Sequence, residues 1–155
     1  MMGIRSAQPD DAAGLLALAE AFYAEGGFTT ESDELAANLA MLLDSDAARV
    51  AVAVDNAELA GFAISTVGFG LEYGQVAILE DLYVAPEHRG RGIGTSLVED
   101  SARWARTMGS RHVELVVAPN GQDASHLFDY YASLGFLDEG RRLLSRPLET
   151  TNPHE

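Results

Sequence analysis

The stretch from Arg89 to Gly94 constrains this chain most, because three glycines there join a predicted strand to a predicted helix. Residues 76–84 predict the strand, and residues 92–108 predict the helix. The first turn of a helix has unpaired N–H groups and a partial positive charge, and glycines let an anion approach the backbone closely. The turn therefore predicts a phosphate-binding loop, to which Arg89 and Arg91 add positive charge.

The overall charge makes such a loop a local exception. The chain has 155 residues, which suits one domain with a hydrophobic core, and a formal net charge of −14. Binding to nucleic acid or to an anionic membrane is disfavoured, because both need a basic surface. The acidic surface serves either solubility or the attraction of a cationic small molecule.

Several other classes of protein and of functional site are disfavoured by what the sequence lacks. No apolar run is long enough to span a bilayer and no signal-peptide pattern opens the chain, so a cytoplasmic protein is expected. Without cysteine there is no thiolate nucleophile and no thiolate metal site. No histidine pair has the spacing of metal ligands, so no metal is expected.

Apolar periodicity and turn residues predict an α/β (α+β) fold with a mixed central sheet of about seven strands and helices on both faces. The order β-α-α-β-β-β-α-β-α-β-β contains one clear parallel crossover, from the strand at 76–84 to the strand at 112–117. The other predicted elements are strands at 3–7, 49–54 and 59–67, helices at 11–24, 30–43 and 122–134, and a closing hairpin from Phe136 onward and over 141–147. A single domain is expected over residues 1–148, with a disordered tail at 149–155.

The loop and its surroundings resemble a known family. Residues 79–94, LEDLYVAPEHRGRGIG, are similar to the acetyl-CoA-binding motif of the GNAT superfamily of N-acetyltransferases. That motif has Gln or Arg, two residues, Gly, one residue, then Gly or Ala; Arg89, Gly92 and Gly94 fill those positions. Asn120 and residues 131–136, YASLGF, resemble the family's second signature. The resemblance extends over residues 3–148 and implies the GNAT fold.

The resemblance implies that acetyl-CoA is the cofactor and that CoA is a product. Backbone amides of the loop would hold the pyrophosphate, and backbone groups of Leu82 and Val84 would pair with the pantetheine arm like an added strand. An amide near Val84 would polarise the thioester carbonyl. The residues expected at the cofactor are Leu82, Tyr83, Val84, Arg89, Gly90, Arg91, Gly92, Ile93, Gly94, Thr95 and Asn120.

The resemblance also implies a general base and a general acid. An amine attacks a thioester only when neutral, so a carboxylate or a water chain must take its proton. Glu80 is the candidate base, because its position resembles the acid of diamine acetyltransferases; Asp81 is the alternative, and neighbours in a strand point to opposite faces. Tyr131, four residues before Gly135, is the candidate acid for the leaving thiolate, whereas Tyr130 is assigned to packing or to the surface.

The predicted reaction is acetyl transfer from acetyl-CoA to a primary amine by direct attack in a ternary complex, since no cysteine can carry the acetyl group. The acidic charge favours a cationic small molecule such as a polyamine or an aminoglycoside; a protein N-terminus or a lysine is an alternative acceptor. The residues expected at the acceptor, unless they serve only capping and packing, are Phe22, Tyr23, Glu25, Phe28 and Glu72. The family resemblance suggests a homodimer. A non-catalytic acyl-CoA sensor is the competing class.

Overall fold

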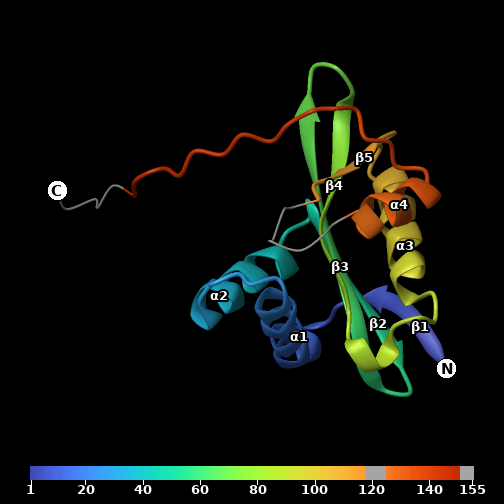
Figure 1. Ribbon diagram of the computed structural model, residues 1–155. Helices are drawn as coiled ribbons and strands as arrows, with labels where there is room; N and C mark the ends of the chain where they lie inside the picture. Colours follow the sequence, from blue (N-terminus) through green and yellow to red (C-terminus); the bar gives the residue numbers. More distant parts are fainter. Residues whose placement is uncertain (118–124, 151–155) are drawn as a thin grey trace.

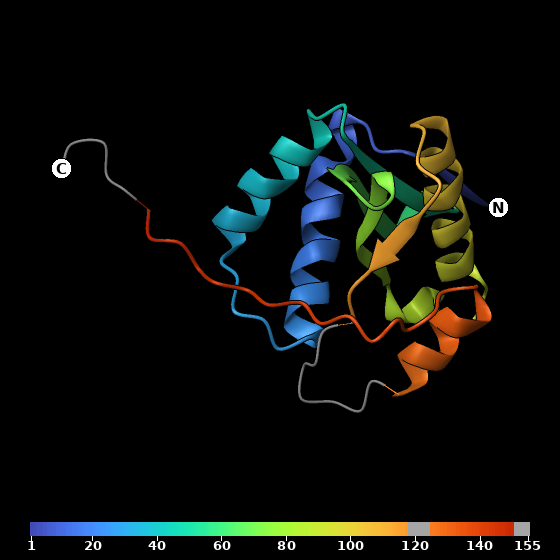
Figure 2. The same ribbon diagram turned by 90° about the horizontal axis from the view of Figure 1, so that it is seen from above.

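The computed structural model describes residues 1–117 and 125–150, which fold around one five-stranded sheet (Figures 1 and 2). Its strands lie side by side in chain order: β1 (Met2–Ser6), β2 (Ala48–Asp55), β3 (Glu58–Gly70), β4 (Gly74–Val84) and β5 (Val113–Leu115). The first four are antiparallel to their neighbours, and β5 is parallel to β4. The helices are α1 (Ala12–Glu25), α2 (Ser32–Leu43), α3 (Ile93–Thr107) and α4 (Ser125–Ser133), with 3-10 turns η1 (Pro9–Asp11) and η2 (Pro86–His88).

The helices cover both faces of the sheet, as the sequence predicts. Helices α1 and α2 lie on one face, and α3 and α4 lie on the other (Figure 1). Alternation along β2 sends Val50 and Val52 toward α1 and α2, and sends Ala51 and Ala53 toward α3. All four side chains are buried, so the centre of β2, residues 50–53, is apolar on both faces rather than alternating with polar residues.

The prediction of about seven strands is wrong, because the closing hairpin is not formed. The described residues 136–150 contain no regular secondary structure. This segment does not alternate between apolar and polar residues, and Pro147 cannot donate a ladder hydrogen bond. Its leucines at 143, 144 and 148 are exposed. The mixed sheet with helices on both faces is confirmed, with five strands in the part of the chain that the structure describes.

Strand β4 carries an extra residue where it faces β3. Ile64 pairs with Asp81 and Ser65 pairs with Leu79, so Glu80 is inserted between them as a β-bulge. A bulge bends its strand and increases the local twist. The pairing of β4 with β5 covers Ala77–Leu79 and stops at this point. The last residues of β4 therefore continue beside β3 beyond the end of the pairing with β5.

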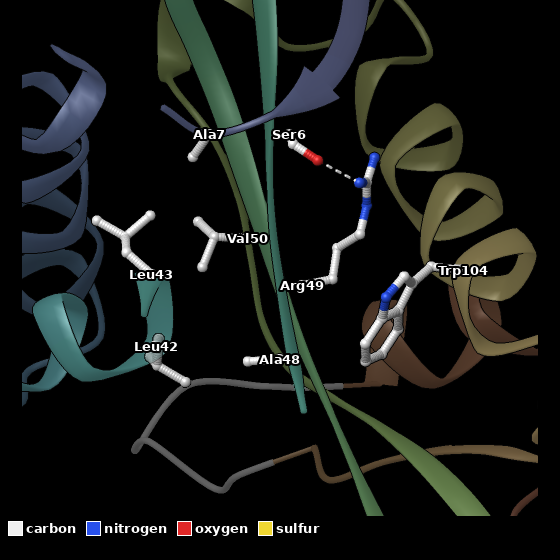
Figure 3. Close-up of a pocket in the computed structure, with 8 residues that line it drawn as sticks. All are labelled: Ser6, Ala7, Leu42, Leu43, Ala48, Arg49, Val50 and Trp104. Atoms are coloured by element: carbon white, nitrogen blue, oxygen red, sulfur yellow. Dashed lines mark hydrogen bonds between the residues drawn. The ribbon is translucent and has the colours of Figure 1, made fainter. Parts of the chain in front are cut away.

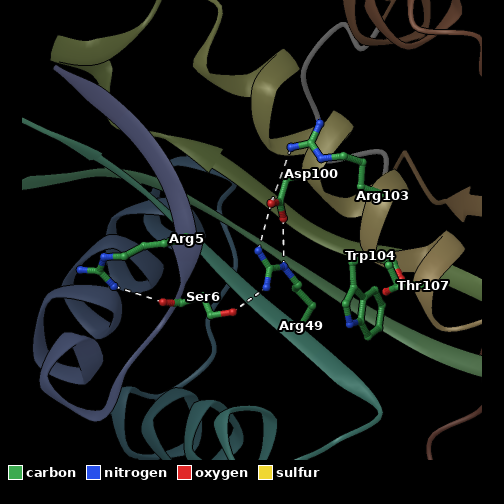
Figure 4. Close-up of polar contacts among 7 residues, drawn as sticks. All are labelled: Arg5, Ser6, Arg49, Asp100, Arg103, Trp104 and Thr107. Atoms are coloured by element: carbon green, nitrogen blue, oxygen red, sulfur yellow. Dashed lines mark hydrogen bonds and ion pairs between the residues drawn. The ribbon is translucent and has the colours of Figure 1, made fainter.

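An ion pair fixes α3 to the sheet (Figure 4). Arg49 of β2 donates from Nε and Nη2 to the two carboxylate oxygens of Asp100, both at 2.9 Å, and from Nη1 to Ser6 Oγ. Asp100 is only 8% exposed, so its charge depends on this bidentate partner. The contact sets the position of α3, and with it the loop that precedes the helix.

We expect Asp100→Ala to destabilise the fold, because it leaves the largely buried Arg49 guanidinium without its carboxylate. The expected loss is about 2 to 3 kcal/mol in the free energy of unfolding, measured by urea denaturation. Arg103→Ala is the matched control, since Arg103 is 62% exposed and its contact with Asp100 spans 3.9 Å. The control should change stability by less than about 0.5 kcal/mol. Equal effects of the two variants would contradict the role given to the pair.

Candidate active site

The loop before α3 is shaped by two glycines in the left-handed conformation. Gly90 has φ 79° and Gly92, the N-cap of α3, has φ 80°. A side chain at either position would be strained. No side chain of the described residues caps the helix, so the N–H groups of its first turn are available to a ligand.

A cleft of about 280 Å³ lies at this loop. It is lined by Val84, His88, Arg89, Gly90, Gly92, Ile93, Gly94, Thr95 and Tyr130. Most of these are residues that the sequence predicts at the cofactor. The end of β4, the glycine turn and the start of α3 thus come together around one cleft. Asn120 lies outside the described residues.

The two arginines of the loop are both held by carboxylates. Arg89 donates from Nε to the Val84 carbonyl oxygen at 2.9 Å, and from Nη2 to Glu25 at 2.9 and 3.1 Å. Arg91 donates from Nη1 to Asp55 at 2.6 Å. The described residues that line the cleft do not include Arg91. Because both arginines are paired with carboxylates, the positive potential of the cleft comes mainly from the helix N-terminus.

Glu25, expected at the acceptor, joins the end of α1 to the loop. The Tyr83 hydroxyl donates a hydrogen bond to Glu25, and the Arg89 guanidinium lies 5.5 Å from the centre of the Tyr83 ring. The hydrogen bond from Tyr83, followed by that from Arg89, lowers the pKa of Glu25. Partial burial beside this carboxylate raises the pKa of Tyr83 to about 12. Glu25 is thus ionised and Tyr83 neutral at neutral pH.

The bulge in β4 changes the surroundings of the candidate base, Glu80, and of its neighbour, Asp81. Exposed Glu80 accepts a hydrogen bond from Thr66 Oγ1 at 3.0 Å, and half-buried Asp81 accepts one from the Tyr23 hydroxyl at 3.1 Å. The charge of Glu80 helps to raise the pKa of Tyr23, so the three groups lie near one another. The extra residue therefore interrupts the simple alternation that the sequence predicts. Burial raises the pKa of Asp81, and the Tyr23 hydrogen bond opposes that rise.

Tyr130 lines the cleft, although the sequence assigns it to packing or to the surface. Its hydroxyl lies 3.1 Å from Thr95 Oγ1 and would be 3.2 Å from a Cβ atom at Gly94. Tyr131 instead packs edge-on against Phe136, with ring centres 5.8 Å apart, and burial raises its pKa. Helical spacing indicates which residues share a face of α4, but it does not indicate that this helix meets α3.

The aromatic residues predicted at the acceptor lie together, and Glu72 lies apart from them. The ring of Phe22 stacks on Tyr83 at 5.2 Å, and Tyr23 contacts Phe28 edge-on at 5.3 Å. Glu72 is in the turn between β3 and β4 and binds Arg141, with both oxygens 2.9 Å from Nη2. The length of β4 separates this turn from the cleft by about 30 Å, because a strand rises roughly 3.3 Å per residue. β3 continues to Gly70, beyond its predicted end, and this extension carries Glu72 away.

A second cleft, of about 170 Å³, lies near the other end of α3 (Figure 3). It is lined by Ser6, Ala7, Leu42, Leu43, Ala48, Arg49, Val50 and Trp104. Arg49 is already bound to Asp100 and Ser6, and none of the predicted site residues is in this lining. Within residues 1–117 and 125–150 no cluster of side chains suits a metal ion, and no helix is long and apolar enough to cross a membrane.

Comparison with known proteins agrees with this geometry. The model of the acetyltransferase (GNAT) family matches residues 14–136, which is most of the chain. The chain therefore belongs to the GNAT family. Its fold is similar to that of the aminoglycoside acetyltransferase AAC(6')-Iy bound to the bisubstrate analogue CoA-S-monomethyl-acetylneamine, with a TM-score of 0.83 and 21% identity. That likeness covers 96% of this chain and 99% of the other.

Two relatives are similar in sequence. Streptothricin acetyltransferase of Streptomyces lavendulae is 39% identical over 87 residues, which are 56% of this chain and 42% of the relative. Aminoglycoside N(6')-acetyltransferase type 1 of Klebsiella aerogenes is 30% identical over 109 residues, 68% of this chain and 72% of the relative. Several other curated relatives are matched over less than half of their own length.

We expect Tyr23→Phe to raise the pKa of Asp81, because the variant removes the hydrogen bond that stabilises the carboxylate while the burial stays. The shift would be followed by NMR titration of the Asp81 side-chain carboxyl carbon. Tyr73→Phe, at the turn between β3 and β4, is the control and should leave this titration unchanged. An unchanged or lowered pKa in Tyr23→Phe would show that the hydroxyl does not bind Asp81 in solution.

Proposed function

We propose that this protein transfers the acetyl group of acetyl-CoA to a primary amine of a cationic small molecule. The observation that carries the proposal is the cleft between the diverging end of β4 and the uncapped start of α3. A helix N-terminus preceded by left-handed glycines suits a pyrophosphate, and a strand end that has no second neighbour among the described residues suits an extended amide chain. Membership of the GNAT family supports both assignments.

The pantetheine arm is proposed to lie along Leu82 to Val84. On one side these residues pair with Ala63, Phe62 and Gly61 of β3, and β5 stops short of them on the other. Gly61 allows the close pairing, since a Cβ atom there would be 2.5 Å from the Tyr83 carbonyl oxygen. Arg89 now donates to the Val84 carbonyl, so cofactor binding requires this side chain to yield or share that oxygen.

Glu80 is proposed as the general base, with Asp81 as the alternative. Glu80 is exposed at the bulge, and Thr66 occupies only one of its carboxylate oxygens. Asp81 is half-buried and bound to Tyr23, but its raised pKa makes it the stronger base. Tyr131 is proposed as the acid that protonates the thiolate. Its raised pKa means that the hydroxyl is protonated at neutral pH, as a proton donor must be.

The amine is proposed to bind beside Phe22, Tyr23 and Glu25. Aromatic faces attract a cationic amine, and the ionised Glu25 carboxylate adds to this only where the amine shares it with Arg89 and Tyr83. The names of the relatives above favour aminoglycosides and related polyamines as the class of acceptor. The homodimer and the cytoplasmic location that the sequence suggests stay predictions.

The proposal is tested by release of CoA thiol from acetyl-CoA with a panel of polyamines, aminoglycosides, amino acids and short peptides. We expect turnover on one class of cationic amine, and a fall in kcat of about 10² in Tyr131→Phe because the thiolate loses its acid. Acetyl-CoA binding by calorimetry should survive in that variant. Tight binding by the wild-type protein without turnover on any amine would favour the acyl-CoA sensor instead.

The identity of the base is tested with Glu80→Gln and Asp81→Asn, each compared with wild type across pH. We expect Glu80→Gln to lower kcat/KM about 10²-fold at neutral pH, because the amine then has no proton acceptor. The loss should shrink as the pH rises, since more of the amine then arrives neutral. Asp81→Asn serves as the isosteric control with a small effect. The reverse pattern would assign the base to Asp81.

A further inference from the structure

Asp55, the last residue of β2, is a buried acid that the proposed reaction does not use. It is 3% exposed, and Arg91 Nη1 lies 2.6 Å from its Oδ2 atom. The hydrogen bond from Arg91 holds the pKa of Asp55 below its usual range, so the carboxylate is ionised at neutral pH. A buried charge of this kind needs a fixed partner, and the nearest one comes from the middle of the glycine loop, while the Met1 ammonium lies 4.0 Å from Oδ1.

The backbone of the loop turns Arg91 toward Asp55. Gly90 and Gly92 flank Arg91, and both have the left-handed conformation. The cleft is lined by both glycines and not, among the described residues, by the arginine between them. The Arg91 side chain is 52% exposed, but its guanidinium is bound to the last residue of β2.

His88 gives Asp55 a second contact with the same loop. Its Nδ1 atom lies 3.3 Å from Asp55 Oδ2, and the residue is 8% exposed. His88 also lines the cleft. One carboxylate oxygen therefore touches the loop at its start and at its centre, on either side of Arg89 and Gly90.

We propose that Asp55 is a positioning residue for the pyrophosphate of acetyl-CoA, and that it acts through Arg91 and His88. The inference rests on the proposed function, since it names how that same cleft is held. Arg91 is then a tether rather than a phosphate ligand: it fixes the loop from behind so that the amides at the start of α3 face the ligand. Misplacement of such amides by about 1 Å is enough to lose much of their effect.

The tether role and the phosphate-ligand role of Arg91 predict opposite changes in acetyl-CoA affinity when the charge of Asp55 is removed. If Arg91 is a tether, removing the charge of Asp55 loosens the loop and weakens acetyl-CoA binding. If Arg91 is a phosphate ligand that Asp55 holds back, the same change frees the guanidinium and tightens binding. Asp55→Asn keeps the size of the side chain and removes its charge, so it separates the two.

The experiment measures the steady-state constants of Asp55→Asn with acetyl-CoA and with S-acetyl-pantetheine, which has no pyrophosphate. We expect KM for acetyl-CoA to rise about tenfold with kcat nearly unchanged, and kcat/KM for S-acetyl-pantetheine to stay at the wild-type value. Glu99→Gln, an exposed acid on α3, controls for the change in net charge. Asp55→Glu restores the charge and should recover part of the affinity.

An unchanged or lowered KM for acetyl-CoA overturns the inference. An equal loss with both donors also overturns it, because the variant then acts on the whole fold rather than on the pyrophosphate end. Calorimetry with CoA gives a readout that needs no acceptor: Asp55→Asn and Arg91→Gln should each weaken binding, and the double variant should lose little more than either alone. Failure of the wild-type protein to bind CoA would refute the proposed function itself.

Discussion

Strand β4 pairs with β3 along its whole length but with β5 only as far as Leu79, and Glu80 is inserted where the two part. Everything proposed for the cleft depends on this insertion. A regular strand would continue beside β5 and leave no backbone edge for a ligand. Because the bulge bends β4, its end at Val84 lies free of β5 and next to the start of α3. The carboxylates of Glu80 and Asp81 also lie at this bulge.

Binding a polyanion to a protein with a net charge of −14 is the second physical problem that this fold solves. The loop arginines do not supply a free patch of charge, because Glu25 holds Arg89 and Asp55 holds Arg91. The attraction must come from backbone dipoles, which carry no net charge and need no counter-ion. Such dipoles act only over short distances, so the loop must be held rigidly. The ion pairs at Asp55 and Asp100 secure the loop and the helix behind it.

Much of this could be predicted from the sequence, and the failures have local causes. Glycines and strand–helix order located the cleft, because phosphate loops need special backbone conformations that few residues permit. The roles of Tyr130 and Asp55 could not be predicted, since each depends on a contact between elements distant in the chain. The sequence placed Glu72 at the acceptor, but the structure places it far from the other acceptor residues. The turn residues between β3 and β4 do not indicate how long the two strands of the hairpin are. The prediction of a closing hairpin was wrong because residues 136–150 do not alternate between apolar and polar side chains as a strand does.

The edge and the two faces of the end of β4 each contact a different part of the molecule. Its backbone edge faces the cleft, Tyr83 on one face packs against Phe22 of α1, and Leu82 on the other packs against the core beneath α3. The positions proposed for cofactor and acceptor thus lie along one strand, which sets the distance between them. A strand held on three sides loses little entropy when ligands bind, because its geometry is already set. In the proposed reaction, the aromatic packing around Tyr83 therefore contributes by holding this strand in position.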